Sequence, residues 1–247
     1  MNILKFATNE ELNEAASGII VSLVQTNPRA VLGLATGSTP IGIYDSLIED
    51  YRKGRVSFRQ VTTFNLDEYV NIPEDHPERY LNFMKRHLFD HVDISPEKAH
   101  IPNGNAADLD EECRRYNRLL EDAKQIDLQI LGLGHNGHIG FNEPDLSLNS
   151  GTHVVKLREQ TLQANARFFE SIDKVPTQAI TMGVGTILKA KMILLVVRGA
   201  AKAETVYQAL RGPITTNIPA SLLQTHPHVV VLLDSEAGRL FDEYDNV

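Results

Sequence analysis

The stretch "AVLGLATGSTPIGIYDSLIEDYRKG", residues 30–54, carries the pattern that decides the fold class. Residues 30–35 form a continuous apolar run, which is typical of a strand buried on both faces of a parallel sheet. Residues 41–54 have a helical pattern and follow Thr39 and Pro40, a candidate N-cap with proline in the first turn. The stretch therefore predicts a strand that leads directly into a helix.

The same alternation continues along the chain. Further apolar runs predict strands at residues 61–66, 127–133, 178–183, 191–197 and 228–233. Further helical patterns cover residues 9–25, 108–123 and 200–212, and the first of them follows a possible capping box of Thr8 and Glu11. Alternating elements of this length predict a doubly wound α/β fold with a mostly parallel sheet. No repeat, low-complexity tract or Pro/Gly linker interrupts them, so we expect a single domain over residues 1–247.

The composition narrows the class of protein. The chain has 247 residues, 42% of them hydrophobic, which is enough for a sizeable core. A net charge of -8 argues against a nucleic-acid partner but allows a local basic pocket for a small anion. Cys113 is the single cysteine, so no internal disulfide is possible and a reducing cytoplasm is expected. The N-terminus lacks a secretory pattern, and the longest apolar run, 192–197, is too short to span a membrane.

In doubly wound folds, ligands bind beyond the carboxyl ends of the strands, so polar residues that follow a strand are site candidates. Gly37, Ser38 and Thr39 follow the first predicted strand and lead into a helix, whose free amides favour an anion. An ordinary strand–helix turn capped by Thr39 explains the same residues. The Gly-Lys-Ser/Thr ending of a Walker loop is missing, so nucleotide hydrolysis is unsupported and a sugar phosphate remains open.

A second cluster, "FNLDEYV" at 64–70, places Asp67 and Glu68 just after a strand. Two neighbouring carboxylates raise a pKa, which suits a base that abstracts a proton at neutral pH. Adjacent residues on an extended chain point in opposite directions, so we expect only one of them to face a site. A solvated acidic turn is the alternative.

The third cluster is "LGLGHNGHIGFNEP", residues 131–144. Its glycines match the spacing of a dinucleotide-binding loop, but that loop needs a long helix after the third glycine. Gly140, Asn142 and Pro144 make such a helix improbable. A metal site of His135, His138 and Glu143 lacks any supporting ligand pattern.

Acid–base chemistry by His138, tuned by Glu143, remains the chemical hypothesis for this loop. Its glycines let backbone amides approach a substrate closely. A loop with satisfied polar groups is the structural alternative.

Four motifs, "TGSTP", "FNLDEY", "GHNGHIGFNEP" and "ARFF", occur in the order found in isomerising glucosamine-6-phosphate deaminases. The chain resembles this family over nearly its whole length. The related 6-phosphogluconolactonases share a Gly-His loop but typically lack the Asn-Glu-Pro ending. The resemblance implies a three-layer αβα fold, an aldose–ketose isomerisation coupled to loss of ammonia, and no cofactor or metal.

The resemblance also implies roles for four catalytic residues. His138 would open the sugar ring by moving a proton from the anomeric hydroxyl to the ring oxygen, and Glu143 would orient that imidazole. Asn136 stands where many members carry aspartate; an amide can orient by hydrogen bonding but cannot hold a charge. Asp67 would move the C2 proton to C1 through an enolamine, giving fructose 6-phosphate and ammonia.

Phosphate binding is implied for Gly37, Ser38 and Thr39, together with the distant cations Arg167 and Lys202. Lys202 follows the predicted strand at 191–197 and lies in the first turn of the next predicted helix. A lysine there opposes the helix dipole, and a bound anion removes that conflict.

The chain departs from the larger family members, which are hexamers activated by an N-acetylated sugar phosphate bound between subunits. The matching positions carry Leu146, His153, Val155 and Lys156, and the sequence ends at Val247 without the longer C-terminal segment. We therefore expect a short, non-allosteric form that is a monomer or a small homo-oligomer. A lid without a strong strand is expected around 145–175, with a helix at 160–171.

Two other functions are consistent with this fold. A sugar-phosphate lactonase needs no carbon-bound proton transfer, so Asp67 would be dispensable. A sugar-phosphate sensor would normally carry a DNA-binding domain, but the first strand is expected near residue 30, which leaves no room for one.

Overall fold

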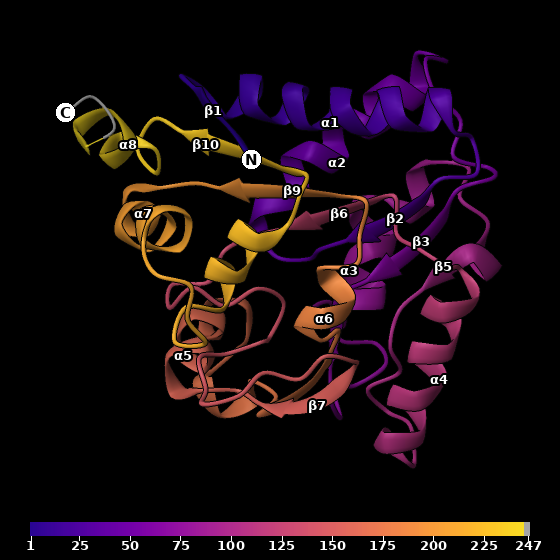
Figure 1. The fold of residues 1–247 in the computed structure, drawn as a ribbon. Helices are drawn as coiled ribbons and strands as arrows, with labels where there is room; N and C mark the ends of the chain where they lie inside the picture. Colours follow the sequence, from indigo (N-terminus) through magenta and orange to yellow (C-terminus); the bar gives the residue numbers. More distant parts are fainter. Residues whose placement is uncertain (245–247) are drawn as a thin grey trace.

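In the computed structural model, which describes residues 1–244, a seven-stranded sheet lies between two layers of helices (Figure 1). All of its strand pairings are parallel, and the order is β1-β10-β9-β6-β2-β3-β5. The strands are β1 Asn2–Phe6, β2 Val31–Leu34, β3 Thr62–Asn65, β5 Ala99–His100, β6 Leu128–Leu131, β9 Met192–Val197 and β10 Val229–Asp234. The predicted three-layer α/β fold with a mostly parallel sheet is confirmed.

The helices cover both faces of this sheet. They are α1 Asn9–Thr26, α2 Ser38–Arg52, α3 Tyr80–His87, α4 Leu109–Asp122, α5 Glu159–Asn165, α6 Val184–Ile187, α7 Ala203–Arg211 and α8 Arg239–Tyr244. Figure 1 shows α1 and α2 together on one face, and α4, α6 and α7 on the other. Strands between these layers are buried on both sides, which explains their continuous apolar runs.

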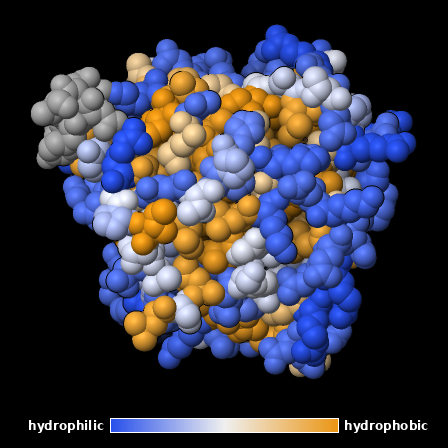
Figure 2. Space-filling model, viewed as in Figure 1, coloured by the Kyte–Doolittle hydropathy of each residue, from blue (hydrophilic) through white to orange (hydrophobic). Residues whose placement is uncertain are grey.

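The outer surface of α4 shows why one helix can be both polar in sequence and part of the core. Cys113 and Tyr116 are buried on its inner side, whereas Glu111 binds Arg114 and Arg118 on its outer side. Figure 2 shows the resulting hydrophilic surface at the lower right, where Figure 1 places α4. Within residues 1–244, no helix has the length and apolar content needed to cross a membrane.

A second, antiparallel sheet of three strands corrects one expectation. It has the order β4-β8-β7, with β4 at Asp67–Tyr69, β7 at His153–Lys156 and β8 at Gln178–Thr181. The run at 178–183, expected in the parallel sheet, forms β8 here. A short apolar run reports burial on both sides but not the direction of the neighbouring strand. The strand β7 also corrects the expected absence of a strand in 145–175; its side chains are only partly buried, so its apolar pattern is weak.

The first strand does not begin near residue 30, as the sequence predicted. Strand β1 spans Asn2–Phe6 and pairs in parallel with β10 at the edge of the main sheet. All five of its residues are exposed or only partly buried, so this edge strand lacks a continuous apolar run. Its position adds one more parallel strand to the main sheet, beside β10.

Helix ends agree with the sequence at some positions and differ at others. Thr8 and Glu11 form the predicted capping box of α1. Thr39 is not the N-cap of α2, because the helix begins one residue before it, at Ser38, after Gly37. The N-cap Gly37 has φ 86°, a conformation that glycine adopts without strain. The helix expected at 160–171 is shorter, since α5 ends at Asn165 and a single 3-10 turn follows.

Candidate active site

A cavity of about 530 Å³ lies at the carboxyl ends of the central parallel strands. Gly37 follows β2, Asp67 follows β3, Gly132 follows β6 and Arg198 follows β9, and all four line the cavity. This is the position at which ligands bind in doubly wound folds. The rule that ligands bind where parallel strands end, here called the strand-end rule, therefore locates the cavity correctly.

The structure brings the predicted site residues together. Eight of the nine line the cavity: Gly37, Ser38, Thr39, Asp67, Asn136, His138, Arg167 and Lys202. The ninth, Glu143, is buried behind His138 and Asn136. Residues more than 160 positions apart in the sequence thus meet around one space.

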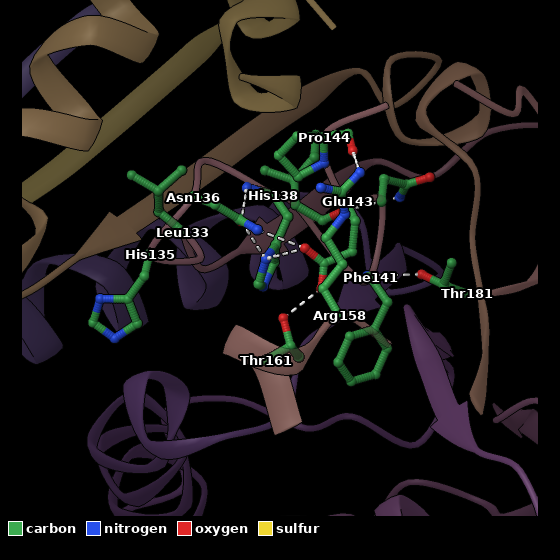
Figure 3. Close-up of polar contacts among 12 residues, drawn as sticks. Leu133, His135, Asn136, His138, Phe141, Glu143, Pro144, Arg158, Thr161 and Thr181 are labelled. Carbon is green, nitrogen blue, oxygen red and sulfur yellow. Dashed lines mark hydrogen bonds and ion pairs between the residues drawn. The ribbon is translucent and has the colours of Figure 1, made fainter. Parts of the chain in front are cut away.

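Three side chains of the loop after β6 form one hydrogen-bonded network (Figure 3). The Asn136 amide donates to Glu143 Oε2 at 2.6 Å, so its carbonyl oxygen Oδ1 is left to accept a hydrogen bond. His138 Nδ1 lies 2.7 Å from that oxygen and must carry the proton that it donates. In neutral His138 the other ring nitrogen, Nε2, therefore has a free lone pair and can act as a base.

Glu143 supplies negative charge to this network. Its Oε2 lies 3.5 Å from His138 Nδ1, and Thr161 from α5 donates a hydrogen bond to its Oε1. Burial raises the pKa of Glu143, but the hydrogen bond and charge of His138, with the bonds from Thr161 and Asn136, lower it to about 2. An ionised Glu143 stabilises the imidazolium of His138 directly, although Asn136 itself carries no charge.

Gly134 gives the His138 ring its space. A Cβ at Gly134 would lie 2.2 Å from Cε1 and 2.3 Å from both nitrogens of that ring. The second glycine of "GLGHNGH" is thus explained by packing against an imidazole, with no nucleotide involved. Gly137 and Gly140 have φ of 82° and 56°, backbone conformations in this turn that glycine adopts without strain.

Replacing Gly134 by alanine is expected to lower the rate of a His138-dependent reaction by roughly 100-fold, because the ring must shift by about 1 Å or more. The unfolding midpoint is expected to change little, since the ring is a side chain that can move away. Kinetics and thermal unfolding together check this. Gly132→Ala is the matched control, because its Cβ meets no atom within 4 Å. Equal losses in both variants would contradict the explanation.

Asp67 and Glu68 face opposite ways, as predicted for adjacent residues of a strand. Asp67 lines the cavity, whereas Glu68 accepts hydrogen bonds from the backbone N–H groups of Tyr69, Tyr80 and Leu81 at 2.9–3.2 Å. Glu68 thereby satisfies amides at the start of α3. These donors favour its ionised form.

The environment of Asp67 makes it a base suited to neutral pH. Burial, together with repulsion by the Glu68 charge, raises the pKa of Asp67 from 3.8 to about 8. Burial also raises the pKa of Glu68, to about 7, against the opposing effect of its backbone donors. A carboxyl group with a raised pKa is a stronger base than an ordinary one once it is ionised.

Replacing Glu68 by glutamine is expected to shift the acid limb of the kcat/KM profile to lower pH by about one unit, because Asp67 loses a neighbouring negative charge. The amide oxygen can still accept from Tyr69 and Tyr80, so most of the capping remains. The pH dependence of kcat/KM measures the shift, with the exposed Glu74→Gln as control. An unmoved acid limb would show that Glu68 does not set the pKa of Asp67.

The other end of the cavity is positive. Gly37 precedes the first turn of α2, whose amides are free of side-chain caps. Lys202 donates to the Leu133 carbonyl at 2.8 Å, and the Arg167 guanidinium lies 4.6 Å from the centre of the Phe168 ring. Burial and the charge of Arg167 lower the pKa of Lys202 to about 8. Lys202 ends a 3-10 turn and immediately precedes α7, rather than lying inside its first turn as expected.

Two alternatives for the loop after β6 are not supported. Figure 3 shows His135 turned away from the network of His138, Asn136 and Glu143. Within residues 1–244, no three His, Cys, Asp or Glu side chains are placed to hold a metal ion. The described loop also contains no helix before β7, as the glycines and proline predicted, so a dinucleotide-binding helix is missing there.

Arg198 and Thr161 are two of the polar cavity residues that sequence reasoning missed. Arg198 directly follows the predicted strand at 191–197, so the strand-end rule could have identified it. Thr161 had no such signal, because its contact with Glu143 depends on how α5 packs over the cavity.

Comparison with known proteins shows the family of the chain. The family model described as glucosamine-6-phosphate isomerases/6-phosphogluconolactonase matches residues 6–232. The chain belongs to this family.

Several members of the glucosamine-6-phosphate isomerase/6-phosphogluconolactonase family are similar over the whole chain. A glucosamine-6-phosphate deaminase of Thermoanaerobacter pseudethanolicus is 49% identical, covering 99% of this chain and 97% of that protein. One of Bacillus pumilus is 50% identical, covering 97% and 100%. The solved structure of a monomeric glucosamine-6-phosphate deaminase is 50% identical with a TM-score of 0.95, covering 97% of this chain and 100% of that chain.

The lactonase branch of the family shares the fold at lower similarity. A 6-phosphogluconolactonase from Trypanosoma brucei has a TM-score of 0.78 and 20% identity, covering 97% of this chain and 98% of that chain. This likeness concerns the fold alone.

Proposed function

We propose that this enzyme converts glucosamine 6-phosphate to fructose 6-phosphate and ammonia. The observation that carries the proposal is that one cavity presents two separate proton-transfer groups, Asp67 and His138, beside a positive end. An isomerisation needs both a group for the ring oxygen and a base for a C–H bond, whereas lactone hydrolysis needs no C–H base. Full-length identity of about 50% to glucosamine-6-phosphate deaminases supports the same conclusion.

The phosphate of the substrate binds at the positive end. The amides of Gly37, Ser38 and Thr39 and the two hydroxyls donate to its oxygens, and Arg167 and Lys202 supply charge. This anchors the sugar with its ring toward His138 and Asp67. Binding of a dianion also favours the protonated form of Lys202, whose pKa is lowered in the free enzyme.

Ring opening is the first chemical step. His138 Nε2 takes the proton of the anomeric hydroxyl and returns a proton to the ring oxygen, which breaks the C1–O5 bond and forms the aldehyde. Asn136 holds Nδ1 in the required tautomer, and the Glu143 carboxylate stabilises the imidazolium between the two transfers.

Asp67 carries out the isomerisation. Its carboxylate removes the proton from C2 while the C2 ammonium gives one of its protons to the aldehyde oxygen, which leaves a neutral enolamine. The same carboxyl group then delivers its proton to C1, and the resulting C2 imine is hydrolysed by water to the ketone with release of ammonia. The substrate ammonium at C2 is a positive charge that lowers the pKa of Asp67 and favours the ionised base.

We further infer that the chain acts as one cytoplasmic domain and as a monomer or small homo-oligomer without an effector site. Leu146, at one of the positions matching the effector site of larger members, is 97% exposed and apolar. The 50% identical structure of a monomeric deaminase supports this inference. Sedimentation velocity of the purified chain tests the assembly state.

The decisive experiment mixes the purified chain with glucosamine 6-phosphate without added metal and measures fructose 6-phosphate and ammonia together. We expect equal amounts of both. A parallel reaction with 6-phosphogluconolactone tests the lactonase alternative. Hydrolysis of the lactone without release of ammonia from the amino sugar would overturn the proposal, as would tight binding of the amino sugar without turnover.

A further inference from the structure

We propose that Arg198 is a further substrate-binding residue that contacts the phosphate of the hexose phosphate. The inference rests on the proposed function and adds a residue to its phosphate-binding set. Arg198 lines the same cavity as Lys202 and the Gly37 turn, and it is the first residue after β9.

Neighbouring elements place Arg198 beside the first turns of α2. Its terminal NH2 group donates to Asn13 of α1. The Asn13 amide in turn packs against Gly42 of α2, where a Cβ would lie 2.2 Å from the amide nitrogen. Gly42 is one turn beyond Ser38, at which α2 begins. The guanidinium is therefore close to the helix end whose free amides favour an anion.

Strand order separates Arg198 from the reacting carbons. Strand β9 neighbours β6, and β6 neighbours β2, so Arg198, the Leu133 segment and the Gly37 turn follow three adjacent strands. Asp67 follows β3, three strands from β9, or about 14 Å at the usual strand spacing. Arg198 thus lies well away from the C–H base Asp67 and beside the segment after β6, whose Leu133 carbonyl accepts from Lys202.

The charge of Arg198 is poorly compensated within the described chain. Asn13 is its one hydrogen-bond partner in residues 1–244, and its Nε is buried without a partner. No ion pair between the described residues includes Arg198, Arg167 or Lys202. The Asp234 charge offsets part of the cost of burying Arg198, but burial is the larger effect and lowers the pKa of the guanidinium. The Asp234 oxygens accept from the backbone of Gly199 and Ala237 and form no ion pair with Arg198 among the described residues.

A half-buried guanidinium with unused donors is costly unless an acceptor arrives. A phosphate offers several charged oxygens and matches the planar fork of an arginine. Arg198 can meet it by a small rotation, since a single neutral amide holds it. The bound phosphate would then be held by three cations from three segments: the 3-10 turn after α5, the turn before α7 and the end of β9.

The test compares Arg198→Met, Arg198→Lys and the control Arg52→Met, an exposed arginine at the far end of α2 with the same change in charge. For Arg198→Met we expect KM for glucosamine 6-phosphate to rise roughly 10- to 100-fold with kcat within about threefold. Arg198→Lys is expected to recover part of the lost affinity. The control Arg52→Met is expected to keep the KM of the unaltered chain.

Calorimetric titration with inorganic phosphate makes the test independent of turnover. We expect its Kd to rise in parallel with KM in Arg198→Met. If the unaltered chain bound phosphate but did not deaminate, the proposed function would fail while the role of Arg198 could still be read. Unchanged KM and unchanged phosphate Kd in both Arg198 variants would overturn the inference. A fall in kcat and thermal stability without any change in KM or Kd would overturn it too, because it would assign Arg198 a purely structural role.

Discussion

Asp67→Asn is expected to lower kcat for deamination by about 10⁴-fold, while KM changes only a few-fold. The amide cannot accept the C2 proton, yet it has the size and polarity of the carboxyl group, and the phosphate contacts lie elsewhere in the cavity. Steady-state release of ammonia measures the effect, and the exposed Asp45→Asn serves as control. A variant that kept more than about a hundredth of kcat would remove Asp67 from the role of base.

The same substitution is expected to stabilise the fold. Asp67 has a pKa of about 8 in the folded chain against 3.8 ordinarily, because its charged form is disfavoured by burial and by Glu68. Folding therefore takes up a proton between these two pH values, and the stability of the native chain falls as pH rises from about 4 to about 8. Asparagine has no such dependence. The melting-temperature difference between Asp67→Asn and the native chain should grow over this range and then level off; a constant difference would contradict the raised pKa.

The second large effect is expected for His138→Gln. We expect kcat with the cyclic substrate to fall roughly 10²- to 10⁴-fold, because no group then carries the proton to the ring oxygen. The glutamine can still hydrogen-bond to Asn136 but cannot change its charge.

A separate measurement distinguishes ring opening from isomerisation. In heavy water with fructose 6-phosphate and ammonium, exchange of the C1 protons reports the Asp67 step on the open chain. This exchange should survive in His138→Gln to a much greater extent than in Asp67→Asn. Equal loss in both variants would mean that His138 takes part in the carbon-bound transfer itself.

The sequence predicted the buried centre of the fold better than its edges. The runs at 30–35 and 191–197 correspond to β2 and β9, because burial on both faces demands apolar residues at every position. Strand β1 is exposed at the sheet edge and does not need an apolar residue at every position, so its sequence resembles that of a loop. The run at 178–183 was recognised as a strand but assigned to the wrong sheet, since direction depends on partners that are distant in sequence.

For the site, the strand-end rule and the motif resemblance located the residues that meet at the cavity, but not their mutual contacts. That Gly134 makes room for the His138 ring, or that Thr161 reaches Glu143, follows only from three-dimensional packing. The lack of charge on Asn136 also matters less than the sequence indicated, because the Glu143 carboxylate lies 3.5 Å from the His138 imidazole and supplies the negative charge directly. Local sequence gives the kinds of group present, whereas distances decide which of them act together.

The pairing of β1 with β10 has a consequence for how the chain reaches its native state. Asn2 lies beside Val230 in the sheet, so β1 has no partner in this sheet until the distant strand β10 has been synthesised. Contacts between such distant segments form slowly, because a very long loop must close first. Residues 2–6 therefore stay without a strand partner during most of translation. The polar residues in this exposed segment lower its tendency to aggregate while it has no partner, whereas a wholly apolar segment of the same length would aggregate more readily.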